Sequence, residues 1–203
     1  MTARLAPRPY WYLRHGETDW NARNLSQGRA DIPLNEAGLL QSARAAEIIA
    51  AHRHDFAPFT HIVSSPLGRA YRTAELVAEK LAAREGVILP ITTDIDLQEV
   101  AFGEQEGQPM GDWYDDWIAG NFTPKGAEPF QQLVSRAVAA IDRTTARDGV
   151  PLVVAHGALF RALRMSMALP ANVRLPNASP LWIAPGSPDP LPWVLTDLGA
   201  AAP

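Results

Sequence analysis

The stretch Tyr10-Trp11-Tyr12-Leu13-Arg14-His15-Gly16 decides the fold, because four aromatic or apolar residues end at two polar side chains and a glycine. Such a short run is typical of a buried strand that delivers polar groups at its end. Two further runs have the same form: His61 to Val63 is followed by Ser64, and Leu152 to Ala155 is followed by His156-Gly157. The sequence therefore predicts three buried strands.

Helical spacing follows the second and third of these strands. Ser65 is placed as an N-cap with Pro66 at the first helical position, and the apolar positions that follow are Ala70, Ala74, Val77 and Leu81. After His156 the same spacing recurs in Leu159, Phe160, Leu163 and Met167. Two more helices are predicted: Glu36 to Ala51 behind the cap Asn35, and an amphipathic one with Phe130, Leu133, Val134, Ala137, Val138 and Ile141.

Alternating strands and helices predict an α/β fold, a three-layer α/β/α sandwich with a mostly parallel central sheet. Residues 103–126 fit this alternation poorly, and we interpret them as a small insertion that covers the C-terminal strand ends. Residues 181–184 and 193–196 flank the proline-rich Pro185 to Pro190, which predicts a hairpin at a sheet edge. We expect one domain over residues 1–203.

Composition excludes several classes of function. A net charge of -4 and a pI near 5.7 argue against nonspecific binding of nucleic acid or anionic lipid. The chain has no cysteine for a disulfide, a thiolate metal site or a thiol nucleophile. No apolar run approaches the ~20 residues that span a bilayer, and residues 1–9 lack the apolar core of a signal peptide. We therefore expect a cytoplasmic protein without nucleic-acid or membrane partners; the oligomeric state is open.

Polar side chains at the three strand ends predict an anion site. In open α/β sheets ligands bind beyond the carboxyl ends of the strands, where Arg14, His15, Arg69 and His156 converge. Two imidazoles and two guanidinium groups near helix N-termini match the oxygens of a phosphoryl group.

Other basic residues and histidines are kept outside this core site. Arg29, Arg161 and Arg164 are as easily surface or helix-face residues as extensions of the pocket. His52, His54 and His61 have no compact acidic partner set, so we interpret them as structural and predict no metal site.

A longer match connects these residues. Leu13-Arg14-His15-Gly16-Glu17-Thr18-Asp19-Trp20-Asn21 resembles the signature of the histidine phosphatase superfamily, the phosphoglycerate mutase-like proteins. Further matches follow in order at Gln27-Gly28, residues 31–38, residues 64–70, Leu97-Gln98-Glu99, Phe102-Gly103, Glu106-Gly107 and His156-Gly157. The resemblance covers about residues 10 to 165 and is strongest to the small-phosphatase branch with alpha-ribazole and broad-specificity phosphatases.

The resemblance implies a role for each matched side chain. It implies that His15 is the phosphorylated nucleophile and Glu99 the proton donor, and that Arg14, Arg69 and His156 bind the phosphoryl group. Asn21 and Gln27 are implied as supporting residues of the pocket. A neutral imidazole can attack in line while fixed cationic donors stabilise the equatorial oxygens, so no metal or cofactor is expected. The expected partner is a small-molecule phosphomonoester.

The sequence favours hydrolysis over mutase activity. Val100-Ala101-Phe102 follows Glu99, where mutases of this family usually carry Arg-His-Tyr. Residues 103–132 hold six acidic residues and only Lys125 as a base, and Ala158 stands where mutases commonly place Asn. We therefore expect water to accept the phosphoryl group. A phosphoglycerate mutase-type phosphotransferase and a non-catalytic phospho-ligand binding or regulatory protein are the alternatives.

The composition of this acidic aromatic insertion indicates which organic group the phosphomonoester carries. It favours an apolar, neutral or cationic group packed against Trp113, Tyr114 or Trp117, although core packing is the alternative for two of these rings.

Overall fold

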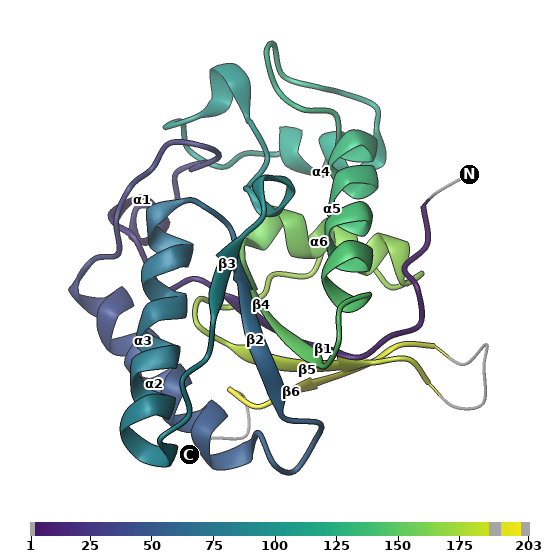
Figure 1. Cartoon of the computed structure of the whole chain (residues 1–203). Helices are drawn as coiled ribbons and strands as arrows, with labels where there is room; N and C mark the ends of the chain where they lie inside the picture. Colours follow the sequence, from purple (N-terminus) through teal and green to yellow (C-terminus); the bar gives the residue numbers. More distant parts are fainter. Residues whose placement is uncertain (1–2, 187–191, 200–203) are drawn as a thin grey trace.

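The computed structural model describes residues 3–186 and 192–199, and its strands form a six-stranded sheet in the order β3-β2-β4-β1-β5-β6 (Figure 1). The strands are β1 (Tyr10–Arg14), β2 (Phe59–Ser64), β3 (Ile91–Thr93), β4 (Val150–Ala155), β5 (Pro180–Ala184) and β6 (Val194–Asp197). β1 to β4 are mutually parallel, whereas β5 pairs antiparallel with β1 and β6 antiparallel with β5. The prediction of a mostly parallel sheet is confirmed.

Helices cover both faces of the sheet, so the predicted three-layer sandwich is confirmed (Figure 1). One layer contains α2 (Glu36–His52) and α3 (Gly68–Glu85), and the other contains α5 (Phe130–Thr145) and α6 (Gly157–Ser166). The shorter elements are α1 (Asp19–Ala22), α4 (Trp113–Ala119) and the 3-10 helices η1 (Ile95–Leu97) and η2 (Gly103–Gln105).

Strand β1 is buried on both faces because successive side chains enter different layers. Trp11 and Leu13 pack with the residues of α2 and α3, whereas Tyr10 and Tyr12 pack with those of α5 and α6. A strand covered on both sides needs apolar residues at every position, not at every second one. Burial on both faces explains why residues 10–13 form a continuous apolar run.

One predicted helix start is wrong. Helix α3 begins at Gly68 behind Leu67, which has extended backbone angles and makes no side-chain cap, rather than behind Ser65. The Ser65 hydroxyl oxygen accepts from the Leu67 N–H at 3.3 Å, closing a local turn before the helix. The cap Asn35 is confirmed, because its side-chain oxygen accepts from the Gly38 N–H at 2.8 Å.

The predicted hairpin is confirmed as the antiparallel pair β5 and β6, which lies at an edge of the sheet. Most of its proline-rich turn, residues 187–191, lies outside the described residues. Strand β3 at the opposite edge was not predicted. Its three residues, Ile-Thr-Thr, are partly or fully exposed and too few to show a period.

The predicted insertion contains η2, an extended loop and helix α4. Trp117 is fully buried and its indole N–H donates to the Glu128 carbonyl at 2.9 Å, while Trp113 packs edge-on against Phe102. Trp117 therefore belongs to the core and Trp113 packs against it, whereas Tyr114 lines a cavity. No helix within the described residues is long and apolar enough to cross a membrane.

Candidate active site

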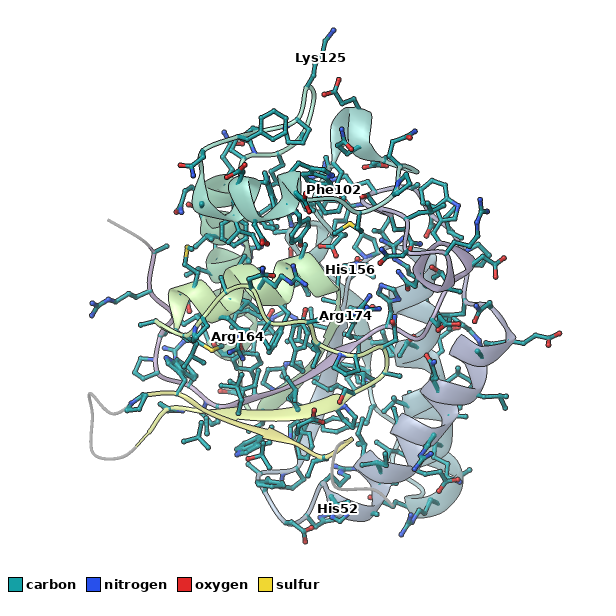
Figure 2. The ribbon with its side chains drawn as sticks, turned by 180° about the vertical axis from the view of Figure 1, so that it is seen from behind. His52, Phe102, Lys125, His156, Arg164 and Arg174 are labelled. Atoms are coloured by element: carbon teal, nitrogen blue, oxygen red, sulfur yellow. The ribbon has the colours of Figure 1, made fainter. Side chains whose placement is uncertain are left out.

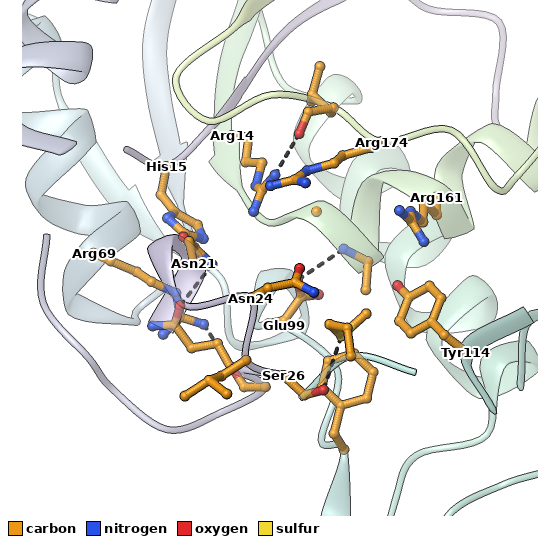
Figure 3. Close-up of a pocket in the computed structure, with 18 residues that line it drawn as sticks. Arg14, His15, Asn21, Asn24, Ser26, Arg69, Glu99, Tyr114, Arg161 and Arg174 are labelled. Atoms are coloured by element: carbon orange, nitrogen blue, oxygen red, sulfur yellow. Dashed lines mark hydrogen bonds between the residues drawn. The ribbon is translucent and has the colours of Figure 1, made fainter. Parts of the chain in front are cut away.

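A cavity of about 180 Å³ opens at the carboxyl ends of β1 and β4 (Figure 3). Four of the five predicted catalytic residues line it: Arg14, His15, Arg69 and Glu99. The supporting residues Asn21 and Gln27 also line it. Residues distant in sequence thus meet because parallel strands end at the same edge of the sheet.

His15 follows β1 and is only 3% exposed. Its Nδ1 lies 2.7 Å from the Gly16 carbonyl oxygen. A carbonyl can only accept, so Nδ1 carries the proton and Nε2 of the neutral ring has a free lone pair. Burial, followed by the positive charges of Arg69 and Arg14, holds the pKa of His15 well below its usual value. The ring is therefore neutral at physiological pH, with Nε2 unprotonated.

A close backbone contact fixes the turn that carries His15. Gly16 lies against the first turn of α2, where a Cβ at position 16 would overlap the Gly38 carbonyl oxygen. The Gly16 N–H donates to the Thr73 hydroxyl at 3.2 Å. Glycine is required here because of close approach, and the contact leaves the His15 turn little freedom to move.

Two buried guanidinium groups flank His15. Arg14 donates from Nη1 to the Leu175 carbonyl at 2.6 Å, and Arg69 donates to the carbonyls of Ala30 at 2.8 Å and Gly28 at 2.7 Å. Burial lowers the pKa of each to about 10, which still leaves both cationic near neutrality. The Nε atoms of both are buried and have no partner in the described part of the chain. The two positive charges on the cavity wall suit an anion.

His156 occupies a different position from the other four predicted residues. It is fully buried and does not line the cavity, but its ring centroid lies 5.1 Å from that of His15. Its Nε2 is 2.7 Å from the Ser65 hydroxyl oxygen, and its Nδ1 has no partner among the described residues. Burial, followed by the positive charge of Arg69, holds the pKa of His156 well below its usual value.

Glu99 reaches the cavity from the loop after η1 and is held by backbone donors. Its Oε1 accepts from the N–H groups of Val100 at 3.1 Å and Leu159 at 3.0 Å, and its Oε2 accepts from that of Ala158 at 3.0 Å. Two of these donors belong to the first turn of α6, where backbone N–H groups have no partner within the helix. Oε2 accepts one bond fewer than Oε1, so it has room for a proton or a water molecule.

Asn21 and Gln27 form one wall of the cavity through bonds to each other and to Thr18. The Thr18 hydroxyl donates to Gln27 Oε1 at 2.7 Å, and Asn21 Nδ2 donates to the same oxygen at 3.3 Å. Asn177, which was not predicted, donates to the His15 carbonyl and to Asn21 Oδ1, both at 3.1 Å. These amides position the turns on either side of His15.

Of Arg29, Arg161 and Arg164, only Arg161 lines the cavity. Arg29 instead contacts the Glu99 carbonyl and Glu128, and Arg164 donates to the Pro170 carbonyl. Arg174 also lines the cavity and was not considered, because it lies in a loop without periodicity or a recognisable motif. No local signal in the sequence identifies it.

None of the acidic residues of the insertion lines the cavity. Asp112, Asp115 and Asp116 are exposed, and the insertion lines the cavity with Met110 and Tyr114. The net charge of the insertion therefore does not determine which substrate body the cavity accepts, and of the three predicted rings only Tyr114 lines it. A short helix exposes one face to solvent, and α4 places its carboxylates on that face.

The three histidines interpreted as structural, His52, His54 and His61, have separate partners. His52 pairs with Asp55 at 2.8 Å, His54 lies 3.4 Å from Glu85, and His61 contacts the Thr60 hydroxyl at 3.1 Å. Within residues 3–186 and 192–199, no three His, Cys, Asp or Glu side chains form a group that could hold a metal ion. Figure 2 shows His52 at the opposite end of the molecule from Phe102, which lines the cavity.

The lowered pKa values of His15 and His156 predict an acid-sensitive fold. The unfolded chain binds a proton at each histidine near pH 6.5, whereas the folded chain does not, so stability falls as the pH falls below 6.5. Each histidine should contribute a loss of about 1.4 kcal/mol per pH unit until its folded-state pKa is reached. Urea titrations at pH 7.0 and 5.5 measure this loss. The change between these pH values should be about 1 kcal/mol smaller in His15→Gln.

Arg23→Gln is the control for this experiment, because Arg23 is exposed and lies outside the cavity, and its replacement removes no histidine. It should keep the wild-type difference between pH 7.0 and 5.5. An unaltered difference in His15→Gln would contradict the assignment of a buried neutral imidazole.

The carboxyl ends of the parallel strands hold a buried neutral histidine between two guanidinium groups. This arrangement is typical of proteins that bind phosphoryl groups. The sequence comparison identifies it further: residues 10–183 match the model of the histidine phosphatase superfamily (branch 1). The chain belongs to this superfamily and is phosphatase- or phosphoglycerate mutase-like.

Relatives of both kinds are similar to the chain. The uncharacterized phosphatase PhoE of Bacillus subtilis is 36% identical over 156 residues, covering 74% of this chain and 72% of the relative. The probable phosphoglycerate mutase GpmB of Proteus mirabilis is 35% identical over 187 residues, covering 83% and 81%. A mycobacterial glucosyl-3-phosphoglycerate phosphatase, solved with VO3, is 27% identical with a TM-score of 0.76, covering 93% and 97%.

Proposed function

We propose that this protein is a metal-independent phosphomonoester hydrolase that forms a phosphohistidine on His15. The observation that carries the proposal is the bond from His15 Nδ1 to the Gly16 carbonyl, which leaves Nε2 as the nucleophilic nitrogen of a neutral ring. In the first step, Nε2 attacks phosphorus, a P–N bond forms and the P–O bond to the alcohol breaks.

Cationic groups stabilise this step. Arg14 and Arg69 lie on the cavity wall with His15, and each has an Nε–H without a protein acceptor among the described residues. Their fixed charges balance the charge on the equatorial oxygens without a metal ion. The ring of His156 packs 5.1 Å from that of His15, centroid to centroid, and its Nδ1 has no partner among the described residues. We assign these three residues to phosphoryl binding.

Glu99 is the proton donor in this proposal. The leaving alkoxide takes a proton from the carboxyl group, and we assign that proton to Oε2, the oxygen with fewer backbone donors. The resulting carboxylate then removes a proton from water, whose oxygen attacks phosphorus. The P–N bond breaks and phosphate is released, which regenerates His15 and protonated Glu99. One carboxyl group serves both half reactions.

Hydrolysis is favoured over mutase activity by the residues that follow Glu99. Val100 is completely buried and Phe102 lines the cavity with an apolar ring, so this segment offers no cation to a returning phosphorylated acid. Residues 103–132 contribute no basic side chain to the cavity either. Relatives named phosphatases, PhoE and the mycobacterial enzyme, are consistent with this choice.

We expect the wild-type protein to release phosphate from phosphomonoesters in the presence of a chelator. A phosphate-release screen across phosphorylated metabolites measures this activity. In parallel, interconversion of 2- and 3-phosphoglycerate with a bisphosphate primer measures mutase turnover, which should be at least about 100-fold slower than hydrolysis of the best ester. Efficient interconversion with little phosphate release would overturn the choice of hydrolase.

A further inference from the structure

Glu99 lies in a segment that belongs to no helix or strand. Residues 98–101 follow η1 and lead toward the insertion without regular secondary structure. Backbone carbonyls in such a segment have no partners from a helix or a sheet, so the buried ones need donors from elsewhere. The position of the carboxyl group that we assign as the proton donor therefore depends on the side chains that bind this segment.

Arg136 of helix α5 supplies these donors. Its Nη1 donates to the carbonyls of Asp96 and Gln98, both at 2.7 Å, and its Nη2 donates to the carbonyl of Glu99 at 3.2 Å. Its Nε and Nη2 also donate to the two carboxylate oxygens of Glu128 at 2.6 and 2.8 Å. An arginine side chain has five N–H groups, and each of the five has an acceptor here. The guanidinium group is therefore fixed in orientation as well as in position.

Glu128 anchors this guanidinium group and also binds the segment directly. The side chains of Arg136 and Glu128 are only 14% and 11% exposed, and their contact is bidentate, which makes it strong and directional. The Glu128 N–H donates to the Ala101 carbonyl at 2.8 Å. The Arg136–Glu128 clamp thus binds the backbone on both sides of Glu99.

Glu99 is therefore held at two ends. Its carboxylate accepts from the N–H groups of Ala158 and Leu159 in α6, and its carbonyl accepts from Arg136 in α5. Arg29 also reaches this carbonyl, but at 3.4 Å and with a side chain that is 46% exposed. Of the two arginines, Arg136 is the shorter and more buried contact, so it should determine where the backbone of Glu99 lies.

We propose that Arg136 is a positioning residue that holds the Glu99 carboxyl group in place for proton transfer. This inference rests on the proposed hydrolysis with Glu99 as the acid. Arg136 does not line the cavity, so it acts through Glu99 and touches no substrate. Proton transfer needs the two heavy atoms to lie about 2.6–3.2 Å apart, and a misplacement of about 1 Å can slow a reaction roughly 100-fold. Loosening the clamp should therefore have the same selective effect as removing the acid.

A comparison of leaving groups tests this effect. Arg136→Gln should lower kcat for an alkyl phosphate by about 10- to 100-fold, and for p-nitrophenyl phosphate by at least about fivefold less. KM should change little, because Arg14 and Arg69 remain in place. Arg143→Gln is the matched control: Arg143 lies on the same helix and pairs with the side chain of Asp96, but it is half exposed. It should leave both rates unchanged.

A second background separates positioning from a general effect on the fold. In Glu99→Gln, the further change Arg136→Gln should lower kcat by less than about twofold, because no acid is left to misplace. An equal loss in both backgrounds, or equal losses for both leaving groups, would overturn the inference. If Arg136→Gln does not fold, Glu128→Gln removes one of the two oxygens that anchor Arg136 and should give a smaller loss with the same selectivity.

Amide hydrogen exchange tests the clamp without catalysis. The Ala158 and Leu159 N–H groups donate to the Glu99 carboxylate, whereas the next amide, Phe160, donates to the His156 carbonyl. In Arg136→Gln, exchange at the first two should accelerate at least about tenfold relative to Phe160. An unchanged ratio would overturn the inference whether or not the protein hydrolyses esters. A raised ratio in a protein that hydrolyses no ester would overturn the proposed function and leave the hold of Arg136 on Glu99 intact.

Discussion

Replacing His15 by alanine should reduce the hydrolysis of p-nitrophenyl phosphate to about one percent of the wild-type rate or less, because it removes the covalent route. The two guanidinium groups remain, so phosphate should still bind. Steady-state release of nitrophenol measures the loss, and calorimetric titration with inorganic phosphate measures the retained binding. Rapid quenching of the wild-type protein with a phosphorylated substrate should also trap an acid-labile phosphohistidine.

The matched control is His52→Ala, which removes an exposed imidazole paired with Asp55 at the far end of the molecule. It should keep full activity. Full activity of His15→Ala would overturn the mechanism. A phosphoryl group trapped on another residue would also overturn the mechanism.

Replacing Glu99 by glutamine should slow hydrolysis of an alkyl phosphate by about 10²- to 10⁴-fold, because no acid then protonates the leaving alkoxide. p-Nitrophenyl phosphate needs little protonation and should lose at least about tenfold less. The structure adds a second effect: Glu99 accepts three backbone N–H bonds, and the amide nitrogen of glutamine can accept none of them. The start of α6 should therefore loosen, and the leaving-group comparison separates this effect from lost acid catalysis.

Glu106→Gln is the control for this structural effect. Glu106 also accepts backbone N–H bonds, from Arg29 at 3.0 Å, Ala30 at 3.2 Å and Phe102 at 3.3 Å, but it does not line the cavity. Any loss in this variant should be the same for both leaving groups. Equal losses for both leaving groups in Glu99→Gln would exclude Glu99 as the acid.

The layered fold was predictable because its signals are local and repeated. The strands around Leu13 and Val153 are continuous apolar runs, and the helices carry apolar residues at helical spacing. The start of α3 was not predictable in this way. Ser65 has the composition of an N-cap, but its hydroxyl bonds to Leu67 and His156, and the second of these contacts is formed only in the folded chain.

Only part of the candidate site could be predicted, for the same reason. His15 and Arg69 could be predicted because each lies at or near a strand end within a specific motif. Arg174 could not, because only tertiary folding brings its loop beside Arg14. The charge of the insertion was misleading for a related reason: composition counts Asp115 and Asp116, but it does not reveal that both face solvent.

The bond from Arg14 to the Leu175 carbonyl leaves substrate preference open to redesign and to divergence among relatives. The bond uses the main chain, so the side chain of the adjacent Arg174 can be exchanged without removing that anchor. The side chains of His15 and Glu99 are held by backbone contacts elsewhere. New specificities should therefore be accessible through single substitutions in this loop, and a library randomised there should yield altered selectivity more often than loss of function.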